Sequence, residues 1–178
     1  MEGINQTELK IDLPFIGHFE RFKNSLKYAF VVNIVSMTLL ILIHFLFLKP
    51  LLFIMVPVAG GGMIVFSLIS YFRNRNWSKI YIIKAYLISE ECLSITVYDK
   101  NKLIFADEPF SVNDISIDRV LVVDGRSISY KIVFTYRKTN HVMFEQYPYG
   151  EWAKNNLIDS FYDTIKELAP AFIDKTHK

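Results

Sequence analysis

Two long stretches without charge constrain the fold of this chain most. Residues 28–48 and 51–72 form uncharged runs of 21 and 22 residues. A helix rises about 1.5 Å per residue, so each run would cover roughly 30 Å, the thickness of a bilayer's hydrocarbon core. Neither run has the polar face of an amphipathic helix in water. We interpret both as transmembrane helices that form a helical hairpin.

The short connection and the flanking charges orient this hairpin. Only Lys49 and Pro50 separate the two spans, which predicts a tight antiparallel turn. Basic residues gather instead at the outer ends of the spans. The membrane-proximal basic residues are Arg21, Lys23, Lys27, Arg73, Arg75 and Lys79. The positive-inside rule then places both termini on the cytoplasmic side of a multi-pass protein of the cell (inner) membrane.

Small residues in the hairpin predict where its helices approach each other. Gly60, Gly61 and Gly62 lie opposite residues 37–39 when the chain is paired around the turn, with Ser36 and Thr38 close by. Missing side chains let helices pack closely. Two readings stay open: the glycines ease packing inside the hairpin, or they form a face through which the chain oligomerises.

Asn33 and His44 are a candidate intramembrane polar site, because polar groups inside membranes are often functional. We expect Asn33 to be hydrogen-bonded to the partner helix. His44 lies five residues before the turn, and it is either an interfacial histidine bonded to a carbonyl or water, or a proton-relay or ligand group.

The rest of the chain divides into two parts on either side of the hairpin at residues 28–72. Residues 1–27 place apolar side chains at helical spacing from Phe15 to Leu26, which predicts a short amphipathic helix after a possible extended arm at 2–13. Residues 77–178 are rich in β-branched and aromatic residues, with turn signals about every ten positions. They predict a cytoplasmic domain.

Six strands and one helix are expected in this domain. The predicted strands cover residues 80–88, 92–99, 103–106, 115–123, 128–136 and 141–147. From residue 151 to 168 the apolar period changes from two to 3.6, which predicts an amphipathic helix that lays its apolar stripe on the sheet. The fold class is therefore a membrane α-helical hairpin plus an antiparallel α+β domain.

Consecutive antiparallel strands followed by one C-terminal helix resemble a pleckstrin-homology-like (PH-like) domain. With two preceding spans, residues 28–168 resemble small bacterial membrane proteins that carry such a domain on the cytoplasmic side. The most suggestive fragment is 144–152, where the helix opens after Pro148, Tyr149 and Gly150. The resemblance implies a curved sheet or barrel of six to seven strands closed by that helix. Phosphoinositide binding is not implied, because Glu90 and Glu91 occupy a loop that is basic in members with that activity.

The chain lacks the sequence features of an enzyme or a metalloprotein. It has no Walker, GxSxG, HExxH or GxGxxG motif. Its four histidines are scattered, and its single cysteine excludes a disulfide framework. The net charge of +2 is too small to imply a nucleic-acid partner. We therefore predict no catalytic residue, no cofactor and no metal, and a function other than catalysis.

An aromatic cluster completes the candidate sites. Phe144, Tyr147, Tyr149 and Trp152 form either the rim of a partner groove or a core corner where strand meets helix. The first functional hypothesis is a membrane-anchored binding or scaffold protein, integral to the lipid bilayer, whose PH-like module binds a peptide, a partner protein or a lipid surface at the cytoplasmic face. A protein partner or a homo-oligomer is expected. The alternative is a small membrane subunit that assembles through its glycine-containing hairpin with itself or with a larger transporter or enzyme.

Overall fold

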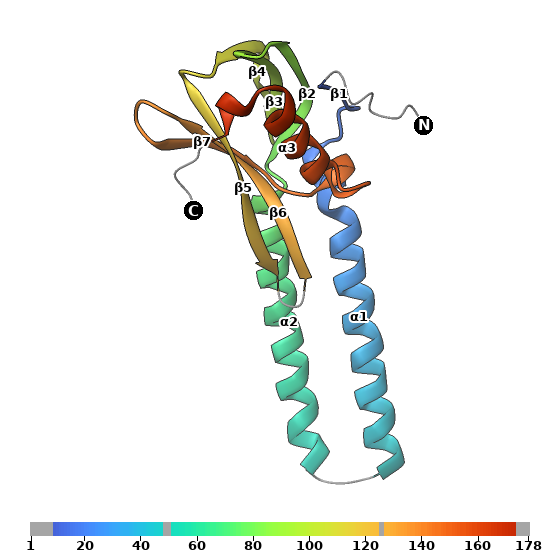
Figure 1. Ribbon diagram of the computed structural model, residues 1–178. Helices are drawn as coiled ribbons and strands as arrows, with labels where there is room; N and C mark the ends of the chain where they lie inside the picture. Colours follow the sequence, from blue (N-terminus) through green and yellow to red (C-terminus); the bar gives the residue numbers. More distant parts are fainter. Residues whose placement is uncertain (1–8, 48–50, 125–126, 174–178) are drawn as a thin grey trace. The chain divides into compact units, whose positions relative to one another are not determined.

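The structure of the chain is a computed structural model that describes residues 9–47, 51–124 and 127–173 (Figure 1). Within these ranges it does not describe the side chains of residues 24–25, 28–29, 44–47, 51–57, 59, 124 and 127. The chain forms two compact units. The helical unit is Phe19–Asn76, and the strand-rich unit combines Met1–His18 with Trp77–Lys178.

The helical unit consists of α1 (His18–Phe47) and α2 (Leu51–Trp77). The two helices pack in an antiparallel register, because Phe22 meets Tyr71 edge to face with ring centroids 6.0 Å apart, and Met37 lies against Gly60. The helix expected from Phe15 to Leu26 is helical from His18 onward and continues without a break to Phe47 as part of α1.

The interpretation of residues 28–48 and 51–72 as transmembrane helices is also wrong. Among the described residues, neither α1 nor α2 is both long enough and apolar enough to cross a bilayer. Among the described residues of these helices, apolar side chains are mixed with polar ones such as Asn33, Thr38 and Ser67.

Several further inferences depended on those spans and are corrected with them. They are the membrane hairpin in the fold class, the multi-pass location in the inner membrane with both termini cytoplasmic, and the membrane-proximal role of the six basic residues. Both functional hypotheses, the membrane-anchored scaffold and the membrane subunit, lose their basis for the same reason.

The first sheet of the strand-rich unit has the strand order β1-β2-β3-β4. Its strands are β1 (Lys10–Asp12), β2 (Ile80–Ser89), β3 (Cys92–Asp99) and β4 (Lys102–Ser111), all antiparallel to their neighbours. The expected N-terminal arm thus contributes a strand, in which Ile11 pairs with Ala85. Alternation places Leu93, Ile95 and Val97 in the core.

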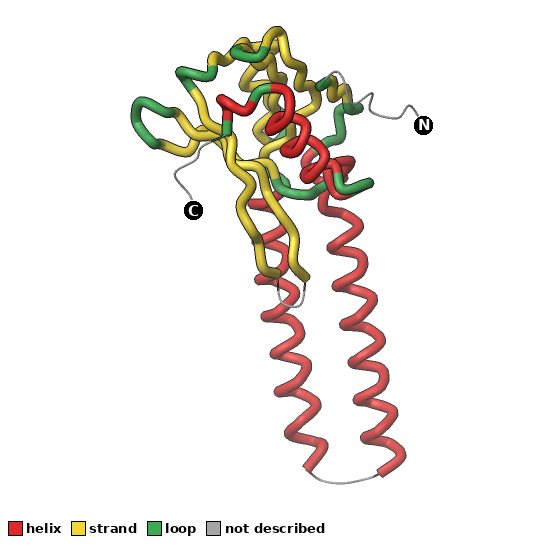
Figure 2. Tube along the Cα trace, in the orientation of Figure 1, coloured by secondary structure: helices red, strands yellow, loops and turns green. Residues whose placement is uncertain are grey.

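The second sheet has the order β5-β6-β7, with β5 (Ile115–Asp124), β6 (Ser127–Tyr136) and β7 (His141–Gln146). The turn from β6 to β7 contains Asn140 at φ 52°, a left-handed conformation that asparagine tolerates. Figure 2 shows the strands of both sheets in yellow. The described strands thus form two antiparallel sheets and no closed barrel, so the barrel alternative of the expected curved sheet or barrel is wrong.

The helix α3 (Leu157–Leu168) buries Ile158, Phe161 and Ile165 against the sheets. It begins six residues later than expected, because residues 150–153 form the 3-10 helix η1 and Asn155 and Asn156 both have positive φ. A second 3-10 helix, η2 (Pro170–Phe172), follows α3.

Buried polar side chains join the two sheets where β2 meets β7. The Ile82 backbone N–H donates to Gln146 Oε1 at 2.9 Å, and the Trp152 Nε1–H donates to the Ile82 carbonyl at 2.8 Å. The Gln146 Nε2 group donates in turn to the Tyr147 carbonyl at 2.6 Å. Ile82 adjoins a register shift in β2, so these side chains satisfy backbone groups beside an irregularity in the ladder.

Candidate functional site

The β5–β6 hairpin has a covered half and an uncovered half. In the covered half, Ile117 pairs with Phe134 and Arg119 with Ile132, and all three apolar side chains are fully buried. Phe161 of α3 packs on Phe134 with ring centroids 6.4 Å apart. This half of the hairpin is part of the hydrophobic core.

Arg119 marks the end of the covered half. Its Nη1 lies 2.9 Å from Asp159 Oδ1 and 3.7 Å from Asp163 Oδ1, both on α3. The guanidinium also lies over the rings of Tyr130 and Tyr162, 4.8 and 4.9 Å from their centroids. Burial, followed by the nearby Asp118 carboxylate, raises the pKa of Tyr162 above its usual value, so its hydroxyl stays neutral. Arg119 thus closes the edge of the core with a partly buried cation.

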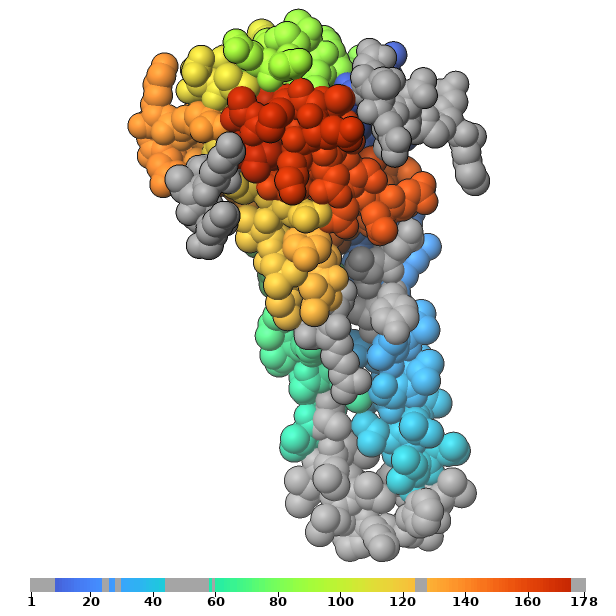
Figure 3. All heavy atoms as spheres, in the orientation of Figure 1, coloured from blue at the N-terminus to red at the C-terminus, as the bar shows by residue number. Residues whose placement is uncertain are grey.

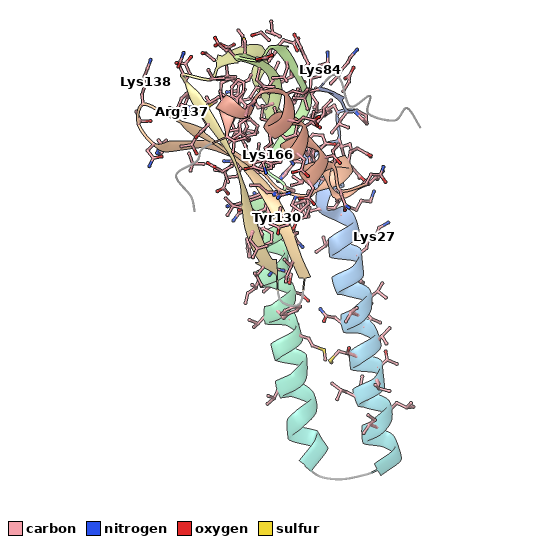
Figure 4. The ribbon with its side chains drawn as sticks, in the orientation of Figure 1. Lys27, Lys84, Tyr130, Arg137, Lys138 and Lys166 are labelled. Carbon is pink, nitrogen blue, oxygen red and sulfur yellow. The ribbon has the colours of Figure 1, made fainter. Side chains whose placement is uncertain are left out.

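Beyond Arg119 the same face of the hairpin continues with exposed side chains, and no described element of the strand-rich unit covers it. The apolar ribbon is defined here as the pairs Leu121–Tyr130 and Val123–Ile128. The exposed fractions are 50% for Leu121, 63% for Val123, 69% for Ile128 and 37% for Tyr130. Figure 3 shows this end of the hairpin, in yellow and orange, extending past the red atoms of α3. In Figure 4, Tyr130 lies at the opposite end of β6 from Arg137 and Lys138.

Among the described residues, no strand pairs with the outer edge of β5 beside the ribbon. Over the described residues, the one backbone bridge on that edge joins Ile117 to Ile173. From Asp118 to Asp124 the pairing of β5 with β6 runs without a register shift, and this stretch has no proline. A strand edge without these interruptions is a template for pairing with another strand.

The edge of β4 is built differently. It contains Pro109, which has no N–H to offer, and Asp107, which has φ 50°. The Asp107 N–H donates to Thr96 Oγ1, and the Thr96 hydroxyl donates to Asp107 Oδ1. Proline and a bulge are the usual devices that prevent edge pairing. Because β4 is protected and the distal part of β5 is not, the β5 edge is the candidate binding edge.

A polar triad lies on the other face of the hairpin. Lys131 Nζ contacts Glu145 Oε1 at 2.6 Å and Tyr147 Oη at 3.2 Å, and Tyr147 Oη donates to Glu145 Oε2 at 2.8 Å. The Tyr147 ring is stacked on Trp77. The three polar groups therefore satisfy one another's hydrogen bonds.

The triad shifts the pKa values of two of its members. Burial raises the pKa of Tyr147, and the hydrogen bond to Glu145 raises it further. Burial alone would lower the pKa of Lys131, but its hydrogen bonds to Glu145 and Tyr147 raise the net pKa above the usual value.

The structure separates the four aromatic residues named from the sequence. Phe144 and Trp152 belong to the buried core. Tyr147 belongs to the polar triad, and Tyr149 is half-buried in the loop before η1. These residues therefore do not line one groove.

The residues named in the hairpin are placed as follows. Gly60 is buried against Met37, while at Gly61 and Gly62 no described atom outside their own helix backbone and chain neighbours lies within 4 Å of the position that a Cβ would take. Thr38 Oγ1 donates to the Ile34 carbonyl of its own helix at 2.9 Å, and Ser36 is half-buried. Asn33 Nδ2 donates to Ser67 Oγ of α2, the bond to the partner helix that the sequence led us to expect. The His44 side chain lies outside the described residues.

The six basic residues differ in exposure and in their ion-pair partners. Lys23 pairs with Glu20 at 2.8 Å and Lys79 with Asp99 at 3.4 Å. Arg21 is buried, Arg73 is half-buried, and Lys27 and Arg75 are exposed. Within the described residues, no three His, Cys, Asp or Glu side chains gather in a way that could hold a metal ion.

Sequence reasoning missed the apolar ribbon, although one signal could have revealed it. The ten residues of β5 or β6 span about 33 Å, whereas the 12 residues of α3 span about 18 Å. One short helix therefore cannot cover a hairpin of that length, and the excess must be exposed or bound elsewhere.

Comparisons with known proteins add no family to this geometry. No family model, no curated protein and no solved structure matches the chain.

Proposed function

We propose that this chain is a protein-binding module, without catalytic activity, that accepts an extended strand of a partner along the outer edge of β5. The partner segment would pair with Asp118–Asp124 and pack its apolar side chains on the ribbon. The observation that carries the proposal is the combination of an open β5 edge with four exposed apolar side chains on the adjoining face. Strand addition uses main-chain hydrogen bonds for affinity and alternate side chains for specificity.

The chemistry around the ribbon supports this reading over catalysis. Arg119, at the inner end of the ribbon, is paired with Asp159 and Asp163 of α3. A nucleophile with an adjacent base, the arrangement that covalent catalysis needs, is not found among the described residues near the ribbon.

The order of four strands, three strands and a final helix also supports a PH-like architecture for the strand-rich unit, which we include in the proposal. The partner in this reading is a protein segment or a second copy of the chain. A phosphoinositide is disfavoured, since Glu90 and Glu91 would repel phosphate.

Photo-crosslinking in cells tests the proposal. A photoreactive residue at position 121 should give a discrete crosslinked protein, and Val123→Lys in the same chain should abolish it by placing a charge on the edge. Position 103 is the matched control, because Leu103 is a leucine of similar exposure on the protected β4 edge. Equal crosslinking from positions 121 and 103, or crosslinks that persist in Val123→Lys, would contradict the proposal.

A further inference from the structure

A groove of about 600 Å³ runs along the helical unit between α1 and α2. Its lining extends from Leu26 to Met37 on α1 and from Gly60 to Tyr71 on α2. This volume lies within the roughly 300–1,000 Å³ that small-molecule sites occupy. The lining is apolar except for Asn33, Ser67 and the Tyr71 hydroxyl, and it contains no charged side chain.

Gly60 shapes one end of the groove. A Cβ at this position would lie 3.2 Å from Met37 Cε and 3.4 Å from Met37 Sδ, so a larger residue would displace Met37 or occupy the groove. At Gly62, by contrast, a side chain has room, because no described neighbouring atom lies within 4 Å of the position that a Cβ would take. A leucine at position 60 should therefore alter the groove, whereas a leucine at position 62 of the same helix is the matched control.

The polar groups of the groove have a defined orientation. Ser67 Oγ donates its proton to the Met63 carbonyl at 2.9 Å, so it can only accept from Asn33. The amide nitrogen of Asn33 consequently faces Ser67, and Oδ1 remains as the acceptor. Over the described residues no donor reaches Asn33 Oδ1.

We propose that this groove binds an uncharged, elongated apolar small molecule whose single hydrogen-bond donor, a hydroxyl or an amide N–H, bonds to Asn33 Oδ1. A charged ligand would lose its hydration without gaining an ionic partner, since no charged side chain lines the groove. This site lies in the helical unit and is separate from the proposed strand-binding edge.

Displacement of the neutral dye Nile red from the full chain tests the proposal. We expect 1-dodecanol to compete about fivefold better than methyl dodecyl ether, because the ether cannot donate the hydrogen bond to Asn33. Asn33→Leu should remove this preference while both compounds still bind. Gly60→Leu should abolish competition by either compound, and Gly62→Leu should leave it unchanged.

Three outcomes would overturn the proposal. They are failure of both compounds to compete, equal effects of Gly60→Leu and Gly62→Leu in chains with the same helical circular dichroism, and an alcohol preference that survives Asn33→Leu. A change of oligomeric state on Gly60→Leu, measured by light scattering, would assign the groove to a second copy of the chain instead. The crosslinking at position 121 should not respond to any of these helical variants, so the two proposals fail independently.

Discussion

Gln146 acts as a structural side chain at the junction of the two sheets. Its amide serves the backbone of Ile82 on one side and of Tyr147 on the other, and it is completely buried. A buried amide in this position holds β2 and β7 in one arrangement, because an apolar side chain cannot satisfy the two backbone groups.

Replacing Gln146 by leucine should therefore lower the free energy of unfolding by about 1–3 kcal/mol, the cost of leaving buried polar groups unsatisfied. Urea unfolding followed by tryptophan fluorescence measures this loss. Thr139→Val, in the exposed turn after β6, is the control and should change the midpoint little. An unchanged midpoint for Gln146→Leu would show that the junction does not depend on the amide.

The polar triad makes a second prediction at this scale, on the pH dependence of stability. Both Lys131 and Tyr147 have raised pKa values in the folded chain, so folding favours their protonated forms. Their contribution is fully present below their unfolded pKa values of about 10 and is lost as the pH rises through the higher folded values. The double variant Lys131→Met/Tyr147→Phe should lose less stability between pH 9 and about pH 11 than the unmodified chain. Parallel curves of unfolding free energy against pH for the two proteins would contradict this assignment.

At the scale of elements, α3 is preceded by Asn155 and Asn156, which both have a left-handed backbone conformation and separate it from η1. Asn156 has φ 53° and ψ 36°, and its carbonyl accepts the first helical hydrogen bond from Ser160 at 3.0 Å. The conformation of residue 156, and not a side-chain cap, thus fixes the start of the helix.

Substitution at position 156 should follow the cost of a left-handed residue. Asn156→Val is expected to destabilise the chain by about 1–2 kcal/mol, because its branched side chain disfavours positive φ, whereas Asn156→Gly should be neutral or slightly stabilising. Thermal unfolding of the pair gives the comparison. A valine variant as stable as the glycine variant would mean that α3 can begin at another residue.

The alternation of apolar and polar residues predicted the six strands that follow the hairpin, because period two is a local property. It could not predict how the strands group, since the break between β4 and β5 depends on pairing and not on pattern. The strand β1 was missed because three residues are too few to show a period, and its partner β2 lies some 70 residues further along the chain. The membrane spans were wrongly inferred from two long uncharged runs without a polar face.

At the scale of the whole molecule, the strand-rich unit is built from both ends of the chain. Leu9 and Ile11 are buried in its core, and Leu13 N–H donates to the Ile83 carbonyl at 2.7 Å. The helical unit is thus inserted between β1 and β2 of a single folded unit.

Replacing residues 19–76 by a Gly/Ser linker of about 12 residues, with a reach of roughly 20 Å, should preserve cooperative unfolding of the strand-rich unit. Residues 77–178 alone should be less stable by about 3 kcal/mol or more, because two core side chains and the cover of the β2 edge are lost. Urea unfolding compares the two proteins. Equal stability would show that β1 is not integral to the unit.

Hydrogen–deuterium exchange on the isolated complex between the full chain and its crosslinked partner tests the strand-addition account most directly. The amides of Asp118–Asp124 should gain protection in the complex, while those of β4, Lys102–Ser111, should exchange at the same rate with and without the partner. Unchanged exchange along β5, or new protection confined to another edge, would contradict binding by strand addition at this site.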